Sequence, residues 1–410
     1  MEPELTHISR LKGLLTIQSA HKKIFLTLFF TIFATVTGVG IVVPLLPIYA
    51  NKMGATGIYV GLIFGSFSLS RTLLLPYFGR LSDKKGRKPF IVVGLAGYAL
   101  VSLAFLMTST VSSLIIIRSL QGIASAMVMP VVQAYVGEIT QEGMEGQSMS
   151  LFNLSMFASL SLGPVMGGLI NDIWSLDAAF VCMGFLSLVG LALSITQLPS
   201  INNEFIKFKE RPPIAWALLV KDVELTGFFI YRFVYTCCIG IIWCFIPILA
   251  QSRIHELSGS DMGILVTLGV FISGLLQLPM GYVADRFNRR VMVVGGGILC
   301  AASMFMMFKS TSYAQFILSV SIFGVGGGIS MPPLMALTLV KGSKMEAMGA
   351  VMAIITVAHS LGMMAGSMGA GVAMDYFTLE TIFPCGAIIM VLGVMLFASF
   401  TTVSVSNLKL

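Results

Sequence analysis

The sequence predicts an all-α polytopic membrane protein in which twelve transmembrane helices form two pseudo-symmetric six-helix bundles. Three observations support this fold class: an apolar composition, continuous apolar runs of membrane-spanning length, and a repeat that relates the two halves. Apolar residue types make up 56% of the 410 residues and charged types only 10%, with a mean hydropathy of +0.93. A soluble fold needs roughly 25% charged residues to cover its surface. A lipid bilayer must therefore be the solvent for most of this chain.

Continuous apolar runs divide the chain into candidate spans. A membrane-spanning helix takes ~20 residues, so 410 residues accommodate twelve spans joined by short loops and no large extramembrane domain. Charged or turn-rich breaks separate the runs, which cover residues 24–50, 57–79, 89–108, 111–136, 147–170, 177–197, 224–250, 261–284, 291–308, 312–339, 347–374 and 381–402.

The polar segments around these runs define the predicted domains. Residues 1–23 precede the first run without a cleavage signal, so we expect an uncleaved cytoplasmic tail. The one long connection, 198–223, is charged and proline-containing, and it separates an N-terminal bundle, 24–197, from a C-terminal bundle, 224–403. A short cytoplasmic tail, 404–410, follows.

The distribution of Lys and Arg predicts the orientation. Nineteen of the 25 basic residues fall on the side of the N-terminus, three (Lys52, Arg253 and Lys309) fall on the opposite side, and three lie within spans. Cytoplasmic loops carry the excess of positive charge. We therefore expect both termini in the cytoplasm and the protein in the plasma (inner) membrane. The net charge of +7 is then a topology signal, and nucleic acid is not expected as a partner.

The two halves repeat each other at an offset of 200 to 203 residues. The matched segments are Gly79-Arg-Leu-Ser-Asp83 with Gly281-Tyr-Val-Ala-Asp285, Met129-Pro130 with Met331-Pro332, Pro47-Ile-Tyr-Ala with Pro247-Ile-Leu-Ala, and Gly168 and Asp172 with Gly371 and Asp375. Because each half has an even number of spans, the halves are parallel repeats about an axis along the bilayer normal. Two such bundles can rock around a central site, which is the architecture of a transporter.

A glycine and acid motif at the inner end of span 2 predicts a conformational gate. The segment runs Gly79-Arg-Leu-Ser-Asp83-Lys-Lys-Gly86-Arg87-Lys88. Glycine permits close approach of a neighbouring helix, and we expect Asp83 to face the positive end of a helix dipole from the other half. The second copy adds Gly281 and Asp285 to the predicted gate.

The motifs of the first half resemble those of the major facilitator superfamily, and within it the twelve-span drug:proton antiporters. The loop motif above is similar to the superfamily signature. Arg118-Ser-Leu-Gln121-Gly122 resembles the antiporter motif of span 4, and Gly163-Pro164-Val-Met-Gly167-Gly168 resembles that of span 5, although Ser159 stands where glycine is usual. Pro44-Leu-Leu-Pro47 resembles a proline pair of span 1. The second half matches by repeat and topology.

The resemblance implies the major facilitator fold, with a cavity lined mainly by spans 1, 4, 7 and 10, alternating access, and export driven by inward proton flow. It implies that Asp83 latches one state, that the span-5 residues Gly163, Pro164, Gly167 and Gly168 belong to the gate, and that Arg118 takes part in proton coupling. Many relatives carry an acid in span 1, but residues 24–50 contain none. Glu138, Glu224 and His359 remain as proton-carrying candidates.

The basic residues within spans are Arg71, Arg118 and Arg232, and no acid lies at the centre of any span. A charge at that depth costs a few kcal/mol and marks functional sites. We predict a substrate site that includes Arg71, Gln121, Arg232, Tyr235, Trp243 and His359. Snorkelling or helix capping explains Arg71 and Arg232 equally well, and packing explains the others nearly as well.

The leading functional hypothesis is a monomeric secondary active transporter that exports drug-like or metabolite-like amphipathic compounds in exchange for protons. An alternative is an exporter or flippase of an anionic amphiphile such as a lipid, siderophore or organic acid, which the buried arginines favour. A non-transporting receptor is a third reading. No catalytic cluster, ATP-binding domain or paired-cysteine metal motif is present, so we expect no enzyme, cofactor, metal or ATPase subunit.

Overall fold

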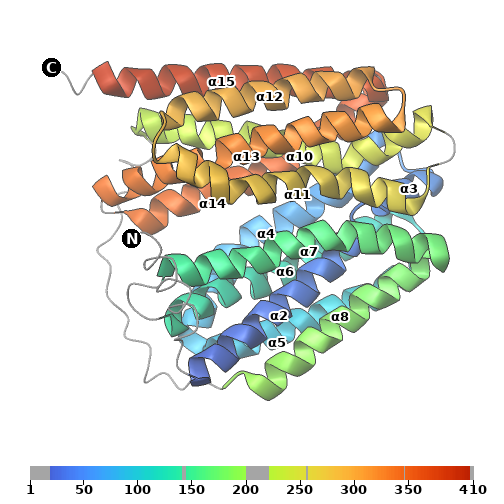
Figure 1. Cartoon of the computed structure of the whole chain (residues 1–410). Helices are drawn as coiled ribbons and strands as arrows, with labels where there is room; N and C mark the ends of the chain where they lie inside the picture. Colours follow the sequence, from blue (N-terminus) through green and yellow to red (C-terminus); the bar gives the residue numbers. More distant parts are fainter. Residues whose placement is uncertain (1–18, 141–144, 200–220, 255–256, 346, 407–410) are drawn as a thin grey trace, which may run out of the picture.

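The computed structural model describes residues 19–140, 145–199, 221–254, 257–345 and 347–406, and every regular element in these ranges is helical (Figure 1). Residues 1–18 and 407–410 of the predicted tails and most of the predicted linker lie outside the described residues, whereas 19–23 and 404–406 belong to helices. The described helices include twelve candidate membrane spans, which confirms the predicted polytopic fold. In the first half they are α2 (Ser19–Val42), α3 (Leu46–Lys52), α4 (Gly57–Lys85), α5 (Arg87–Leu106), α6 (Val111–Ile139), α7 (Glu145–Ile173) and α8 (Leu176–Gln197).

The second half contains a matching set of six long helices and one short 3-10 turn. They are α10 (Val223–Arg253), α11 (Gly259–Ala284), α12 (Arg289–Lys309), α13 (Tyr313–Lys344), α14 (Met348–Tyr376), η2 (Leu379–Thr381) and α15 (Ile382–Ser406). Predicted and observed ends agree within a few residues, because the same charged and turn-forming residues that break the apolar runs also end the helices.

The first predicted span is two helices and not one. A turn at residues 43–45 separates α2 from α3, with hydrogen bonds from the amides of Val43 and Leu45 to residues three positions earlier. Pro44 has no amide hydrogen and cannot continue the helix. Pro47 stands in the first turn of α3, where a missing amide hydrogen costs nothing. The segment predicted at 24–50 therefore crosses the membrane with a break near its outer end.

Polar residues in the loops set the starts of several helices. A side-chain oxygen accepts a hydrogen bond from the amide three residues later at Thr110, Ser175, Asp222 and Ser258. Each bond satisfies one of the amides that the first turn of a helix leaves without a partner. These capping bonds are local in the sequence, and they fix the residues at which α6, α8, α10 and α11 begin.

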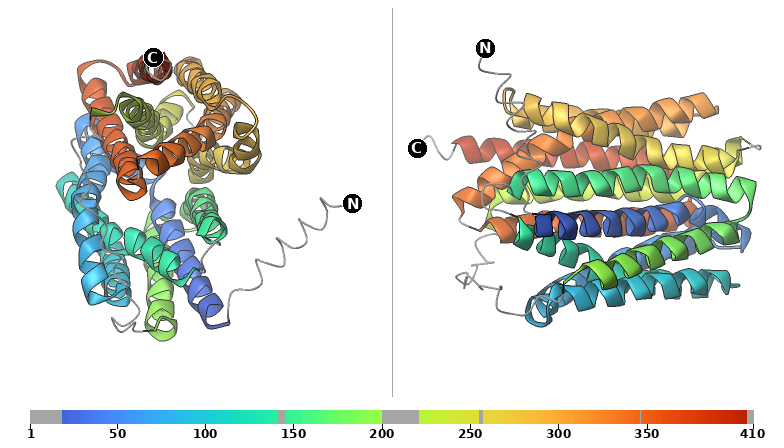
Figure 2. Two further views of the ribbon diagram at one scale, coloured as in Figure 1. Left: turned by 90° about the vertical axis from the view of Figure 1, so that its left-hand side faces the viewer. Right: turned by 60° about the horizontal axis from the view of Figure 1, so that its bottom comes forward.

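Helix packing reproduces the sequence repeat. In the N-terminal bundle α2 packs on α7 and α8, α5 packs on α6 and α8, and α4 packs on α6. The C-terminal bundle shows the same pattern, with α10 on α14 and α15, α12 on α13 and α15, and α11 on α13. The two bundles form separate groups of helices in Figure 2. They meet mainly through two equivalent helix pairs, α4 with α14 and α7 with α11.

Glycine permits close contact between the helices of each bundle. A Cβ atom on Gly366 of α14 would collide with the carbonyl oxygen of Cys237 on α10. A Cβ atom on Gly369, less than one turn further along α14, would meet nothing within 4 Å. Gly366 and Gly369 are therefore the same residue type on the same helix but differ in how closely a neighbouring helix approaches them.

We predict that Gly366→Ala lowers the free energy of unfolding by about 1–3 kcal/mol, because the backbone of α10 must shift to admit the methyl group. Thermal unfolding of the purified protein in detergent measures this effect. Gly369→Ala is the matched control and should not lower the transition, because the methyl group meets no neighbour and alanine favours the helix. Equal stability of the two variants would contradict the packing described for α10 and α14.

Candidate functional site

The two bundles are joined at one end of the molecule, which we call the outer end. It is the end that carries the starts of α4 and α11, and the charge distribution predicts that it faces away from the cytoplasm; the opposite end is the inner end. Asp375, at the end of α14, accepts hydrogen bonds from the amides of Gly57 (2.6 Å) and Ile58 (2.9 Å) at the start of α4.

The second bundle contact has the same chemistry. Asp172, at the end of α7, accepts hydrogen bonds from the amides of Gly259 (2.6 Å) and Ser260 (2.8 Å) at the start of α11. The Ser260 hydroxyl donates a third bond to the same carboxylate at 2.7 Å. We call Asp172, Asp375 and the two helix starts that they cap the outer latch. Each carboxylate also lies at the positive end of a helix dipole that belongs to the opposite bundle.

Glycines bring the backbones together beside the outer latch. A Cβ atom on Gly61 of α4 would lie 2.5 Å from the carbonyl oxygen of Ser367 on α14. A Cβ atom on Gly259 would lie 2.7 Å from Asp172 Oδ1. Any larger residue would force the helices apart, so both contacts depend on glycine.

The inner halves of the bundles are not joined in the same way. Across the described ranges, every hydrogen bond between the bundles lies in the outer half, and the deepest joins the Thr267 hydroxyl to the Ser161 carbonyl at 3.0 Å. Near the inner ends of α4 and α11, Cβ atoms on Gly79 and Gly281 would meet nothing within 4 Å. The structure is therefore closed at the outer end.

The loop motif forms an ion network inside the N-terminal bundle. Arg87 is buried and donates to Glu138 through Nε (3.0 Å) and a terminal nitrogen (2.6 Å), and to the Ser82 hydroxyl at 2.6 Å. The same guanidinium forms an ion pair with Asp83. In this outer-closed structure Asp83 thus faces its own bundle, whereas the sequence predicted that it faces a helix of the other one. Gly86, which separates α4 from α5, has a φ of 87°, which favours glycine.

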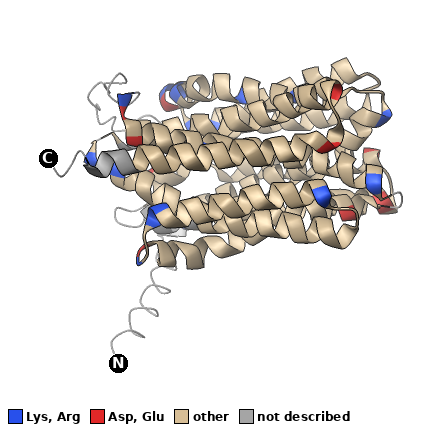
Figure 3. Ribbon diagram, turned by 90° about the horizontal axis from the view of Figure 1, so that it is seen from above, with Lys and Arg blue, Asp and Glu red and all other residues tan. Residues whose placement is uncertain are grey.

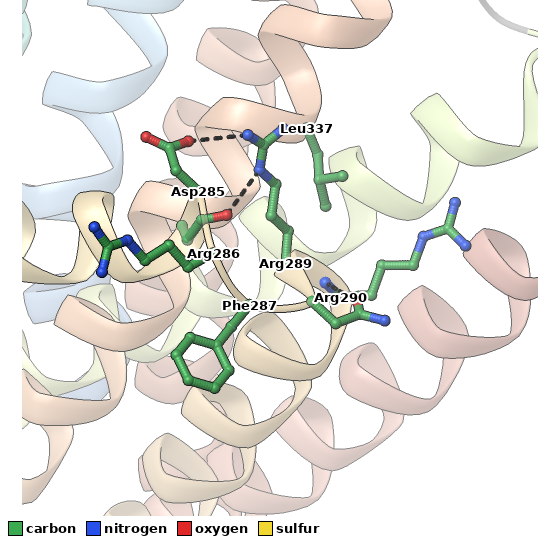
Figure 4. A pocket seen from close by; sticks show the side chains of 8 residues that line it. Asp285, Arg286, Phe287, Arg289, Arg290 and Leu337 are labelled. Atoms are coloured by element: carbon green, nitrogen blue, oxygen red, sulfur yellow. Dashed lines mark hydrogen bonds and ion pairs between the residues drawn. The ribbon is translucent and has the colours of Figure 1, made fainter.

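The second copy of the loop motif borders a shallow pocket at the inner end of the C-terminal bundle (Figure 4). Arg289 bonds to Asp285 and to the Ala284 carbonyl, each at 3.0 Å, and Arg290 bonds to Glu224 at 3.1 Å. Arg289 stands 202 residues after Arg87, so the acid–arginine pair of the first copy is repeated. The internal repeat predicted a role for Asp285 but not for its partner Arg289.

The span-5 motif lies where α7 contacts both α2 and α11. A Cβ atom on Gly163 would lie 2.7 Å from the Thr37 carbonyl oxygen, and one on Gly167 would collide with the backbone of Ile41. Gly168 faces the start of α11, and the Pro164 carbonyl approaches Gly263 of the same helix. The motif thus supports both the interior of one bundle and its contact with the other.

Arg118 is buried in the outer half of α6, seven residues from the start of the helix, and is held by its own bundle. One terminal nitrogen donates to Gln121 Oε1 at 2.6 Å, and Nε donates to the Ile63 carbonyl at 3.2 Å. The guanidinium also stacks over the rings of Phe64 and Phe67, 5.1 and 4.5 Å from their centroids. The arginine and glutamine of the span-4 motif therefore form one rigid unit.

A second group of cations lies between the bundles. Arg232 of α10 lies 3.2 Å from His359 Nδ1 on α14 and donates to the Met331 sulfur at 2.8 Å. Arg71 lies at the middle of α4, the helix of the opposite bundle that packs against α14. The Nε atoms of Arg71 and Arg232 are both buried without a hydrogen-bond partner. We call Arg71, Arg232 and His359 the central cation group.

The remaining predicted site residues lie at two different depths. Tyr235 stacks on Phe323, with 5.6 Å between ring centroids, and Trp243 packs against the core of the C-terminal bundle. Glu138 and Glu224 lie at the inner ends of α6 and α10 and form ion pairs there. Neither acid is brought to the central cation group. Figure 3 shows this distribution, with most charged residues at the two ends of the helices.

Comparison with known proteins identifies relatives over the whole length of the fold. The sequence profile of the Major Facilitator Superfamily matches residues 28–255 and 228–409. An uncharacterised MFS-type transporter of Methanocaldococcus jannaschii is 29% identical over 371 residues, 90% of this chain and 95% of the relative. The quinolone resistance protein NorA of Staphylococcus aureus is 26% identical over 275 residues, which are 66% of this chain and 68% of NorA.

Solved structures show the same fold at lower identity. The nucleoside transporter NupG superposes with a TM-score of 0.79 at 12% identity and covers 92% of this chain and 99% of its own. The human organic anion transporter TETRAN superposes with a TM-score of 0.66 at 17% identity, covering 93% of this chain and 100% of its own.

We predict that replacing both latch carboxylates, Asp172→Asn with Asp375→Asn, opens the outer end. The neutral amides are weaker acceptors and lose the attraction of the helix dipoles. Hydrogen exchange by mass spectrometry should then speed up about ten-fold or more at residues 57–58 and 259–260. Asp177→Asn removes an acid at the start of α8 and is the control. Unchanged exchange in the double variant would contradict a role for the latch in closing this end.

Proposed function

Because this chain belongs to the Major Facilitator Superfamily, we propose that it is a secondary active exporter of amphipathic compounds, working by alternating access in exchange for protons. The observation that carries the proposal is the one-sided closure of the bundles. The outer latch joins them at one end, and the described contacts between them stop short of the other.

The geometry of the interface supports a rocking motion. The two pairs α4–α14 and α7–α11 are related by the internal repeat, so both lie at equivalent distances from the repeat axis. Separation at the outer latch and approach at the inner ends need no change inside either bundle. The glycines Gly79 and Gly281 have free space in this state and are available for close contact in the opposite one.

The substrate class rests on the relatives and on the residues inside the spans. NorA is named as a quinolone resistance protein and TETRAN as an organic anion transporter, and both names refer to organic compounds. In this chain polar side chains inside the spans lie among aromatic and methionine neighbours: Arg118 lies beside Phe64 and Phe67 in the outer half, and Arg232 beside Met331. Such surroundings fit a compound that is part apolar and part polar.

Proton exchange rests on the antiporter motifs and on one titratable residue. Arg118, for which the span-4 motif implies a role in proton coupling, donates a hydrogen bond to Gln121 of the same motif. Among residues at mid-depth, His359 has the side chain whose ordinary titration range is nearest to neutral pH. Glu138 pairs with Arg87 far from this depth. We therefore assign the proton-carrying role to His359.

We predict that a disulfide across the outer end stops transport. A Cβ atom on Gly57 would lie 2.5 Å from the Gly371 carbonyl oxygen and 2.7 Å from the Met374 Cβ, so cysteines at positions 57 and 374 can bond once the helices separate by about 1 Å. In proteoliposomes, the oxidised Gly57→Cys, Met374→Cys variant should show no solute flux, and reduction of the same sample should restore it. Equal flux in both forms would refute alternating access at this interface.

We predict that solute movement drives proton movement. Proteoliposomes that contain a pH-sensitive dye would receive cationic, neutral and anionic amphiphiles, with and without an imposed pH difference. Arg118→Gln should abolish both fluxes, because it breaks the buried Arg118–Gln121 unit. Arg286→Gln is the matched control, since Arg286 is exposed and bonds to the Tyr282 hydroxyl. Solute flux without any proton movement would remove exchange from the proposal.

A further inference from the structure

The central cation group lies at mid-depth, where an uncompensated charge is least stable. Arg71 is the middle residue of α4, which runs from Gly57 to Lys85. Gly61 contacts Ser367 and Gly65 contacts Met368 on the antiparallel helix α14. Continuing inward by the helical rise of 1.5 Å per residue, Arg71 lies about 15 Å below Gly61 and His359 about 12 Å below Ser367, the residue that Gly61 contacts. The two residues therefore lie at similar depths on two helices that pack against each other.

The group has no counter-charge within the protein. Every aspartate and glutamate whose side chain the structure describes lies within four residues of a helix end. The ion pairs of the described chain do not include Arg71, Arg118 or Arg232. Arg71 also makes no hydrogen bond to any described residue, and its Nε is buried. A charge in the membrane interior normally pairs with another group or marks a substrate pathway.

Arg232 is oriented by weak partners that leave its charge free. Arginine can only donate hydrogen bonds, so His359 Nδ1 must accept the bond from Arg232. The histidine proton then resides on Nε2. The other acceptor is the Met331 thioether, which is weak and uncharged. The guanidinium is thus held in place without being neutralised.

We propose that Arg71 and Arg232, the latter positioned by His359, bind the oxyanion group of an amphipathic organic anion such as a carboxylate, sulfonate or phosphate. This proposal specifies the substrate class of the proposed exporter. It rests on the exporter function for one point, that the bound anion is the transported compound. A planar guanidinium fork matches the two oxygens of such a group. Two forks with unused donors, at similar depths and with no acid nearby, favour an anion over a neutral or cationic head group.

The site draws its ligands from both bundles. Arg71 belongs to the N-terminal bundle, whereas Arg232 and His359 belong to the C-terminal one. Arg71 lies on α4 and His359 lies on α14, and the outer latch joins the outer ends of these two helices. A rocking motion at this pair changes the distance between the two guanidinium groups. Anion affinity is therefore tied to the conformational state.

Equilibrium binding tests the site without requiring transport. The full-length protein in nanodiscs of neutral lipid would be titrated with dansylglycine, which is anionic, and with neutral dansylamide and cationic dansylcholine, which share its apolar ring. We expect dansylglycine to bind at least about ten-fold more tightly than the other two. Arg71→Gln and Arg232→Gln should each weaken it about ten-fold or more, as expected for loss of a charged hydrogen bond.

Two further comparisons separate a binding role from a structural one. Arg286→Gln removes an exposed arginine outside the site and should leave dansylglycine affinity unchanged. His359→Gln retains an acceptor for Arg232 and should bind within a few-fold of the parent, whereas His359→Leu should not. In the absence of anion, Arg71→Gln should unfold at a higher temperature than the parent, because a charge at membrane depth whose buried Nε has no partner is removed. A variant that merely fails to fold would do the opposite.

Nanodiscs that contain anionic phosphatidylglycerol distinguish a lipid head group from a soluble anion. If phosphatidylglycerol competes with dansylglycine, the lipid head group is a source of the oxyanion. If it does not compete, the oxyanion belongs to a soluble compound. Both results agree with the proposed site. Equal affinity for all three probes, or unchanged affinity in both arginine variants, would overturn it. Selective anion binding without solute flux in proteoliposomes would instead reject the exporter function and leave the site standing.

Discussion

Two helix starts whose amides are capped by carboxylates from the opposite bundle hold the outer end of this protein closed. The start of α4 shows why this matters, since Thr56 makes no side-chain cap of its own and the first amides depend on Asp375. A hydrogen bond to a charged group contributes about 1.5–3 kcal/mol, and less where water can replace it. These bonds lie near the surface, so they are strong enough to favour one state and weak enough to be exchanged for water in a transport cycle.

Stronger networks hold each bundle together as a unit. Arg87 joins α5 to the inner ends of α4 and α6 through Asp83 and Glu138. In the C-terminal bundle, Lys341 of α13 bonds to Asp222 (2.7 Å) and Glu224 (3.1 Å), and Arg290 of α12 joins the same Glu224. These ion pairs are partly buried and connect helices of one bundle only. Motion is therefore concentrated at the two symmetric interfaces, where glycine backbones and surface carboxylates make the contacts.

The sequence predicted the number of spans, the repeat and the pairing of motifs, because apolar runs and spacing are local properties. It also placed Asp172 and Asp375 in equivalent positions. Their role as caps could not be read from the repeat, since the capped amides lie 87 and 318 residues away and are set by how the bundles dock. The contact between Arg232 and His359 joins residues 127 positions apart and was hidden for the same reason. The span-1 break followed from Pro44, a local signal that the hydropathy of the run obscured.

The charges of this protein are separated by depth, and this separation constrains how transport is energised. Acids occupy the helix ends, whereas Arg71, Arg118 and Arg232 lie well inside the described spans, with Arg71 at the centre of α4. A carboxylate at mid-depth, which would bind a proton or a cationic cargo, is therefore missing from the described spans, and the field there attracts anions. An outward-moving anion gains about 2.3 kcal/mol per charge for each 100 mV of interior-negative potential. Inward movement of a proton, like outward movement of an anion, makes the interior less negative. The same membrane potential therefore favours both fluxes of the proposed exchange. A cationic centre lets the protein use this potential to export an anion without a buried acid.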